Sequence, residues 1–185
     1  MTAWIVSAMA LCGGTLLLGS PPLAAAAAQP AAPIAGSGLD GALAGRILAI
    51  HNRERGLVGV PPLAWDDRVA AAAAQYARQL AERGRLEHSQ RESRGGTGEN
   101  LARGVVGYHS VESLAELWVA EKSAFRNGTF PDVSTTGSWR AVGHYSAMIW
   151  RSTTAVGCGT AGNGRDLYLV CRYAPAGNVI GRRVY

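Results

Sequence analysis

The sequence lacks any run of five basic residues, although its formal net charge is +5 over 185 residues. Its arginines are scattered and no aromatic side chains alternate with them, a pattern that argues against nucleic acid as a partner. The positive charge is compatible with an acidic surface such as a membrane or a cell wall. The length allows one domain of ordinary size and little else.

Charged side chains are also absent from the first 39 residues. An apolar run at positions 3–18 is followed by two prolines and an alanine tract whose small residues suit signal peptidase. We therefore expect a signal peptide at 1–28, a flexible linker at 29–39 and one domain at 40–185. Secretion follows from this division. The alternatives are a periplasmic location or a retained N-terminal membrane anchor, for which the apolar run is short.

Cysteine is scarce, and only Cys158 and Cys171 remain once the leader is removed. An even pair in an exported protein suggests a disulfide. Strand-like residues flank the sequence AGNGRD at 161–166, and a hairpin centred between Gly164 and Arg165 places the two cysteines opposite each other. The pattern predicts a Cys158–Cys171 disulfide, with two buried thiols as the alternative.

Helical patterns precede strand patterns along the chain. Helices are predicted at residues 40–55, 67–84 and 111–125. Asp66 or Asp67 caps the second helix, Gly84 ends it, and Ser110 caps the third. Strands are predicted at residues 146–151, 155–160 and 167–173, whereas the polar, glycine-rich stretch 85–104 is expected to be irregular. Helices followed by hairpin-connected strands predict an α+β fold with an antiparallel sheet.

The third predicted helix carries a carboxylate at the end of its apolar stripe. Leu114, Leu117, Trp118 and Glu121 fall on one face at spacings of three and four residues. A buried carboxylate needs cationic or hydrogen-bonding partners, or it stays protonated. The simpler interpretation is that the stripe ends here and Glu121 is solvated.

Three further polar residues, His88, Glu99 and His144, lie beside glycine, serine or asparagine in or near predicted loops. Together with Glu121 they could form a metal or acid–base site. Their separations of 11, 22 and 23 residues match no local metal-binding spacing. The residues alone therefore leave a structural role open for each.

Two long segments resemble a known family. GHYSAMIWRST at 143–153 and YLVCRYAPAGN at 168–178 resemble the two signatures of the CAP superfamily, which comprises cysteine-rich secretory proteins, antigen 5 and pathogenesis-related proteins. The blocks HNRERGLVGVPPLAWDDRVA, HS, GENLA and LWVAE resemble its other segments, in the same order. The resemblance is nearest to the plant pathogenesis-related type. Plant relatives usually have more disulfides, and their second signature commonly has Asn where this chain has Arg172.

The resemblance implies an α–β–α sandwich with a central antiparallel sheet, as a CAP (SCP) domain over residues 40–185. It also implies a cleft with two histidines and two glutamates, which fall on His88, Glu99, Glu121 and His144. We expect the two histidines to bind zinc or another divalent cation. The two glutamates would act as catalytic bases or orient the metal ligands.

Two classes of function follow from the resemblance. Family members are associated with sterol or lipid binding and with cell-wall or host–microbe interaction, which predicts a secreted binding module. The alternative is a metal-dependent hydrolase, a protease or esterase that uses the same cleft. Two histidines are few for a catalytic zinc site, and no nucleophile elbow surrounds Ser89 or Ser146. A binding module is therefore favoured, and a purely structural role for the four residues is the third possibility.

Overall fold

The computed structural model describes residues 39–185. The predicted signal peptide at 1–28 and most of the predicted linker at 29–39 lie outside the described residues. Among residues 39–185, no helix combines the length and the apolar character that a membrane span requires.

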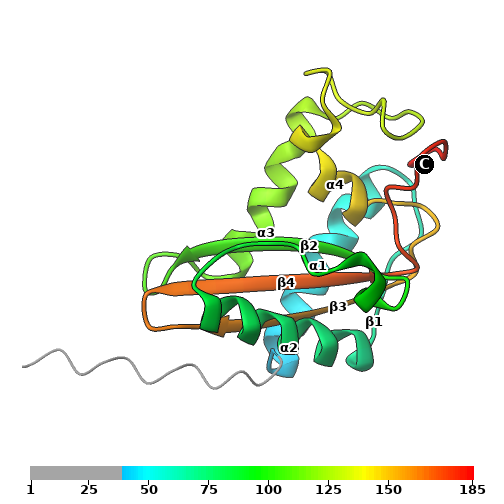
Figure 1. The fold of residues 1–185 in the computed structure, drawn as a ribbon. Coiled ribbons are helices and arrows are strands. Elements are labelled where there is room, and N and C mark those ends of the chain that lie inside the picture. Colours follow the sequence, from blue (N-terminus) through cyan, green and yellow to red (C-terminus); the bar gives the residue numbers. More distant parts are fainter. Residues whose placement is uncertain (1–38) are drawn as a thin grey trace, which may run out of the picture.

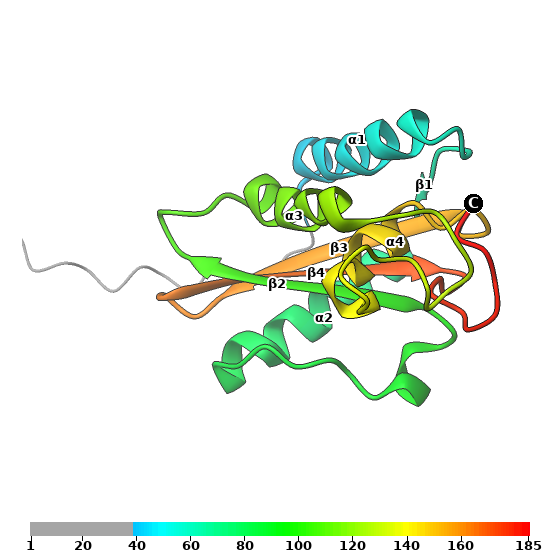
Figure 2. The same ribbon diagram turned by 90° about the horizontal axis from the view of Figure 1, so that it is seen from above.

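Residues 39–185 form an α–β–α sandwich, which confirms the predicted fold class (Figure 1). The helices are α1 (Gly41–Leu57), α2 (Asp67–Arg83), α3 (Val111–Ala120) and α4 (Gly143–Met148). The strands are β1 (Ala64–Trp65), β2 (Gly98–Val105), β3 (Ala155–Gly162) and β4 (Asp166–Ala174). Figure 2 shows α2 on one side of the sheet and α3 and α4 on the other, where α1 packs against α3.

The sheet has the strand order β1-β3-β4-β2. The pairs β3–β4 and β2–β4 are antiparallel, and the two residues of β1 pair with β3 in parallel. In the β3–β4 hairpin Cys158 lies opposite Cys171, in the predicted register, and the two cysteines form a disulfide. Because β2 is an edge strand, the residues near its start can contact loops from both layers.

The helix ends agree with the predicted caps. The Asp66 side chain accepts hydrogen bonds from two amides of the first turn of α2, at 2.8 and 3.0 Å. Gly84 ends this helix with a left-handed φ of 67°, which glycine adopts without strain. Asp40 and Ser110 cap α1 and α3 in the same way as Asp66.

Helix α2 packs on β3 through residues without bulky side chains. A Cβ atom added to Gly157 would lie 2.2 Å from the backbone nitrogen of Ala70, and one added to Gly159 would lie 2.3 Å from the Cα of Ala74. Neither distance is sterically possible for a real side chain. The alanine tract of α2 and the glycines of β3 are thus one feature, a very close helix–strand contact.

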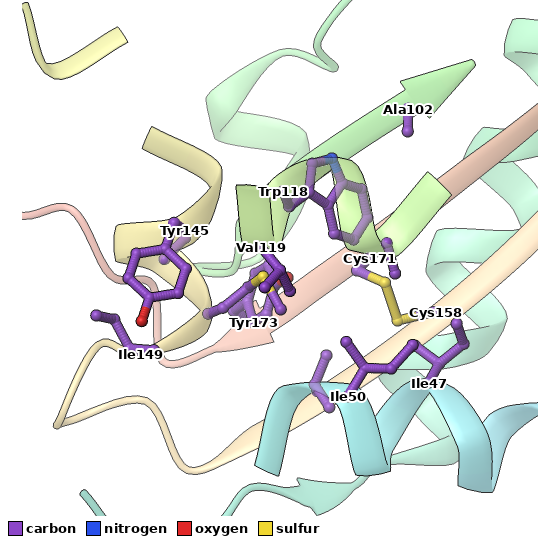
Figure 3. Close-up of a cluster of buried hydrophobic side chains, with 14 of the residues drawn as sticks. Ile47, Ile50, Ala102, Trp118, Val119, Tyr145, Ile149, Cys158, Cys171 and Tyr173 are labelled. Carbon is purple, nitrogen blue, oxygen red and sulfur yellow. A yellow bond between two sulfur atoms is a disulfide. The ribbon is translucent and has the colours of Figure 1, made fainter. Parts of the chain in front are cut away.

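On the opposite face, the core joins side chains from α1, α3 and α4 and from the sheet (Figure 3). Trp118 of α3 is 2% exposed and packs above the disulfide, with Ile47 and Ile50 of α1 nearby. Leu117 departs from the sequence prediction, because it is 53% exposed. The apolar stripe of α3 is therefore narrower than the sequence pattern indicated.

The predicted strand at 146–151 is wrong, because residues 143–148 form helix α4. Every residue from Tyr145 to Trp150 is buried, so the apparent alternation of this segment does not mark one buried and one exposed face. The Glu121 carboxylate accepts hydrogen bonds from the amides of His144 and Tyr145 and thereby caps the first turn. A residue distant in the sequence thus stabilises the helix.

Strand β2 lies within the stretch 85–104 that was expected to be irregular. Its sequence GENLARGV contains glycine, glutamate and asparagine, which are depleted in strands. All eight of its residues pair with β4. Pairing with a buried neighbouring strand overrides the weak local preference.

Candidate functional site

His88 and Glu99 form the first of two histidine–glutamate pairs. Nδ1 of His88 lies 2.8 Å from Oε1 of Glu99. The buried carboxylate also accepts hydrogen bonds from the Ser89 amide at 3.0 Å and the Ser89 hydroxyl at 2.7 Å. Nη2 of Arg172, opposite Glu99 in the sheet, lies 3.3 Å from Oε2. The loop after α2 therefore meets the start of β2 in a charged, hydrogen-bonded cluster.

These partners determine the ionisation of Glu99. Burial alone would raise the pKa of this carboxyl group, but hydrogen bonds from His88 and Ser89 and the nearby positive charge of Arg94 outweigh burial and lower the pKa to about 2. Glu99 is therefore ionised at neutral pH and is a weak base.

His144 and Glu121 form the second pair, on the other side of the sheet. Nδ1 of His144 lies 2.6 Å from Oε1 of Glu121. Oε2 of the same carboxylate accepts the amides of His144 and Tyr145, both at 3.0 Å. The imidazole stacks on Trp118, with ring centroids 6.0 Å apart and planes 19° from parallel. The end of α3 and the start of α4 are thus fastened together at this pair.

Asn100 connects the second pair to the strand that carries the first. As neighbours on β2, Glu99 and Asn100 direct their side chains to opposite faces of the sheet. Nδ2 of Asn100 donates to the carbonyl oxygen of His144 and to the Tyr173 hydroxyl, both at 3.0 Å. The Tyr173 hydroxyl also lies 2.9 Å from Nε2 of His51. A buried hydrogen-bond network therefore runs from α1 to the second pair.

His51 is neutral in this network. Burial lowers its pKa to about 4, despite the hydrogen bond between its Nδ1 and the carbonyl oxygen of Ile47 at 2.8 Å. The carbonyl requires a proton on Nδ1, so Nε2 accepts the hydrogen bond that Tyr173 donates. His51 is therefore a structural histidine of the core.

The four residues predicted for the cleft are brought together two by two. Each glutamate contacts Nδ1 of its histidine, and no hydrogen bond within residues 39–185 occupies Nε2 of His88 or His144. Over the same residues, no set of three or more His, Cys, Asp or Glu side chains is arranged to hold a metal ion. The arrangement thus offers two oriented imidazoles, without a carboxylate placed as a third ligand.

A polar pocket of about 520 Å³ adjoins the first pair. It lies between α2 and the loop that follows it, and we call it the α2 pocket. Its lining includes Gln75, Tyr76, Gln79, Arg83, His88 and Arg172. No sequence pattern predicts this pocket. The one relevant signal was Arg172, at a position where plant relatives commonly have Asn.

The fold agrees with comparisons of this chain with known proteins. The model of the cysteine-rich secretory protein family, CAP, matches residues 48–173. The chain therefore belongs to this family, as the resemblance predicted.

Its curated relatives include pathogenesis-related proteins 1C and 1B of Nicotiana tabacum, which are 41% and 40% identical to this chain over 139 residues. Each match covers 75% of this chain and 78% of the relative. Pathogenesis-related protein 1 of Arabidopsis thaliana is 39% identical over 139 residues, covering 75% of this chain and 80% of the relative. The similarity to the plant pathogenesis-related type is thereby confirmed.

Solved structures of similar fold include a crystal structure of NaASP2 with Zn²⁺ and the structure of BmVAL-1. NaASP2 is 26% identical, with a TM-score of 0.70 over 80% of this chain and 87% of its own. BmVAL-1 is 24% identical, with a TM-score of 0.65 over 80% of this chain and 83% of its own. At this identity the second comparison supports the fold alone.

Proposed function

We propose that this chain is a secreted binding module in which His88 and His144 bind zinc or another divalent cation. We further propose that it acts in defence or host–microbe interaction by binding a cell-wall component, a sterol or a lipid. The observation that carries the metal proposal is the hydrogen-bonding pattern that the two imidazoles share. Each has a carboxylate at Nδ1 and no hydrogen bond within the described residues at Nε2.

This orientation suits metal binding. A carboxylate that accepts the Nδ1 proton fixes the tautomer whose Nε2 lone pair can bind a metal. A zinc ion on these two nitrogens would supply a positive, Lewis-acidic centre with open positions for a ligand. The related protein NaASP2 has been crystallised with Zn²⁺. The chemistry of the two imidazoles therefore suits such an ion, with Glu99 and Glu121 as the residues that would orient the ligands.

The same geometry favours binding over hydrolysis. A general base works best when its pKa is near the ambient pH, whereas that of Glu99 is about 2. Both oxygens of Glu121 already accept hydrogen bonds, from His144 and from two amides. Neither carboxylate is thus placed to take a proton from a metal-bound water, which argues against the hydrolase alternative.

Secretion is supported by three observations. The first 39 residues carry no charged side chain, the fold contains a Cys158–Cys171 disulfide, and the matching family is described as secretory. The N-terminal sequence of the protein recovered from the culture medium tests this, and we expect it to begin at Gln29. Protein found only in the cells, with residues 1–28 intact, would contradict secretion.

The metal proposal is tested by calorimetric titration of the purified protein with zinc. We expect one ion per chain, and a loss of affinity of roughly tenfold or more in both His88→Gln and His144→Gln. His109→Gln is the matched control, because His109 belongs to neither pair. Unchanged zinc affinity in both variants, or an equal loss in the control, would exclude the site. Two ions per chain would show that each pair binds separately.

A further inference from the structure

The α2 pocket differs in character from most small-molecule sites. Its volume of about 520 Å³ is within the range of ligand pockets, roughly 300–1,000 Å³. Such pockets are usually lined by apolar and aromatic side chains. Here the lining includes the amides of Gln75 and Gln79 and the hydroxyl of Ser93. A sterol or an acyl chain would find little apolar surface in this pocket.

Positive charge predominates around the pocket. Arg83 and Arg85 line it near the end of α2, and each has a nitrogen 3.1 Å from the same Glu87 oxygen. The two arginine side chains are 48% and 68% exposed, so they can turn toward a ligand. One carboxylate shared between two guanidinium groups leaves a net positive charge at this rim. Arg172 adds a further guanidinium to the lining, and its charge is partly balanced by Glu99.

Arg172 is only partly paired, although the carboxylate of Glu99 lies beside it. Its side chain is only 9% exposed, and its guanidinium lies over the Tyr76 ring at 5.5 Å from the centroid. Nη2 makes two long contacts of 3.3 Å, to the Ser89 hydroxyl and to Glu99. Nε is buried and has no hydrogen-bond partner among the described residues. A buried cation with an unsatisfied donor is unfavourable, and a bound anion would relieve it.

We propose that the α2 pocket binds an acidic sugar, with the carboxylate or sulfate of the sugar on Arg83, Arg85 and Arg172. The planar guanidinium fork matches such oxyanions. The hydroxyls of the sugar would bond to the Gln75 and Gln79 amides and to Ser93. This inference deepens the proposed cell-wall binding by giving it a site and a ligand chemistry, and it does not depend on the metal.

The test is a calorimetric titration of the purified protein in EDTA at low salt, so that failure of the zinc proposal cannot affect it. The probes are a tetramer of galacturonic acid and a sulfated oligosaccharide, with neutral cellotetraose for comparison. We expect the acidic sugars to bind and the neutral sugar not to bind. Added NaCl should weaken the binding, because exposed charges contribute to it.

Two variants test the residues. Arg83→Gln with Arg85→Gln changes exposed side chains only, so the fold is retained, and we expect affinity to fall roughly tenfold or more. Arg172→Lys keeps the positive charge but removes the planar guanidinium group, and it should also weaken binding. The matched control is Arg165→Gln with Arg182→Gln, two exposed arginines outside the pocket, and it should bind normally.

Three results would overturn the inference. The first is unchanged affinity in the Arg83/Arg85 double variant, and the second is an equal loss in the Arg165/Arg182 control. The third is binding to phosphatidylserine vesicles or to inorganic phosphate with no binding of acidic sugar. That last result would assign the pocket to lipid headgroups or to free anions.

Discussion

The two histidine–glutamate pairs have the same internal geometry but are held by different means. In the first pair, the carboxylate of Glu99 is held by the hydroxyl and the amide of Ser89 and by the guanidinium of Arg172. In the second pair, two backbone amides hold the carboxylate of Glu121. The first pair is thus part of a charge network, whereas the second is part of the helix framework. Their responses to mutation and to pH should differ accordingly.

The largest expected effect comes from replacing Glu99. Glu99→Gln leaves the buried Arg172 without its anion, and breaking a buried ion pair costs about 3–5 kcal/mol. Glu121→Gln keeps an acceptor oxygen for the amides and should cost only about 1–2 kcal/mol. Urea unfolding followed by circular dichroism measures both. Equal losses in the two variants would show that the pairs are held in the same way.

The second-largest difference between the two pairs should appear in how stability depends on pH. The pKa of Glu99 is about 2 in the folded protein, whereas an unperturbed glutamate has a pKa of 4.5. Folding therefore disfavours the protonated form. The corresponding stability is present above pH 4.5 and is lost as the pH falls toward 2, amounting to roughly 3 kcal/mol. Unfolding free energies measured across this range should fall in wild type and in Glu121→Gln. The fall should be much smaller in Glu99→Gln.

His51 adds a separate acid effect that both variants share. Its folded pKa of about 4 is below the reference value of 6.5, so folding favours the neutral ring. The stability it contributes is present above pH 6.5 and is lost as the pH falls toward 4. Because His51 is untouched in both glutamate variants, the comparison between them below pH 4 is unaffected. A wild-type protein equally stable at pH 7 and pH 4 would contradict this assignment.

Replacement of Asn100 should have a smaller effect, and it tests whether the buried hydrogen-bond network contacts only the second pair. Asn100→Ala removes the hydrogen bonds to Tyr173 and to the carbonyl of His144, at a cost of about 2 kcal/mol for the two bonds. The ring signals of His144 in NMR spectra should shift, whereas those of His88 stay in place. Equal shifts in both histidines would mean that the pairs are coupled through the start of β2.

The smallest effect is expected at the rim of the α2 pocket. The Arg83–Glu87 pair joins side chains that are 48% and 36% exposed. Such surface pairs contribute little, so Arg83→Gln should change the unfolding free energy by no more than about 0.5 kcal/mol. Thermal unfolding checks this. A large loss of unfolding free energy would show that the rim of the pocket stabilises the first pair. The loss of sugar binding expected in the Arg83/Arg85 double variant would then have a structural cause.

Local sequence signals were sufficient to predict α2 and the β3–β4 hairpin. The Asp66 cap and the Gly84 stop act within one turn of the helix, and the hairpin register follows from a short turn. The errors at α4 and β2 have the opposite cause. Glu121 caps α4 from 23 residues away, and β2 pairs over its whole length with a strand about 70 residues later. Neither contact leaves a local pattern.

The site was harder to predict from the sequence than the fold was. No periodicity connects His88 to Glu99 or Glu121 to His144, and only the family resemblance placed the four residues in one cleft. Residues 167–173 of β4 are all buried, so no alternation singled out Arg172, and its partners come from a loop and from an edge strand. Asn100 and Tyr173 carry no sequence signal of their own, because their importance lies in a shared hydrogen bond.

The disulfide has a mechanical consequence. It joins β3 to β4, the two central strands of the sheet, and closes a segment with a sequence separation of 13 residues. Under tension applied to the chain ends, this segment cannot extend. The stretched chain is therefore shorter by roughly 40 Å of contour length. The three larger helices are free of any such crosslink to the sheet within residues 39–185. A stretched molecule would therefore lose its helical layers while a closed loop remained at the centre of the former sheet.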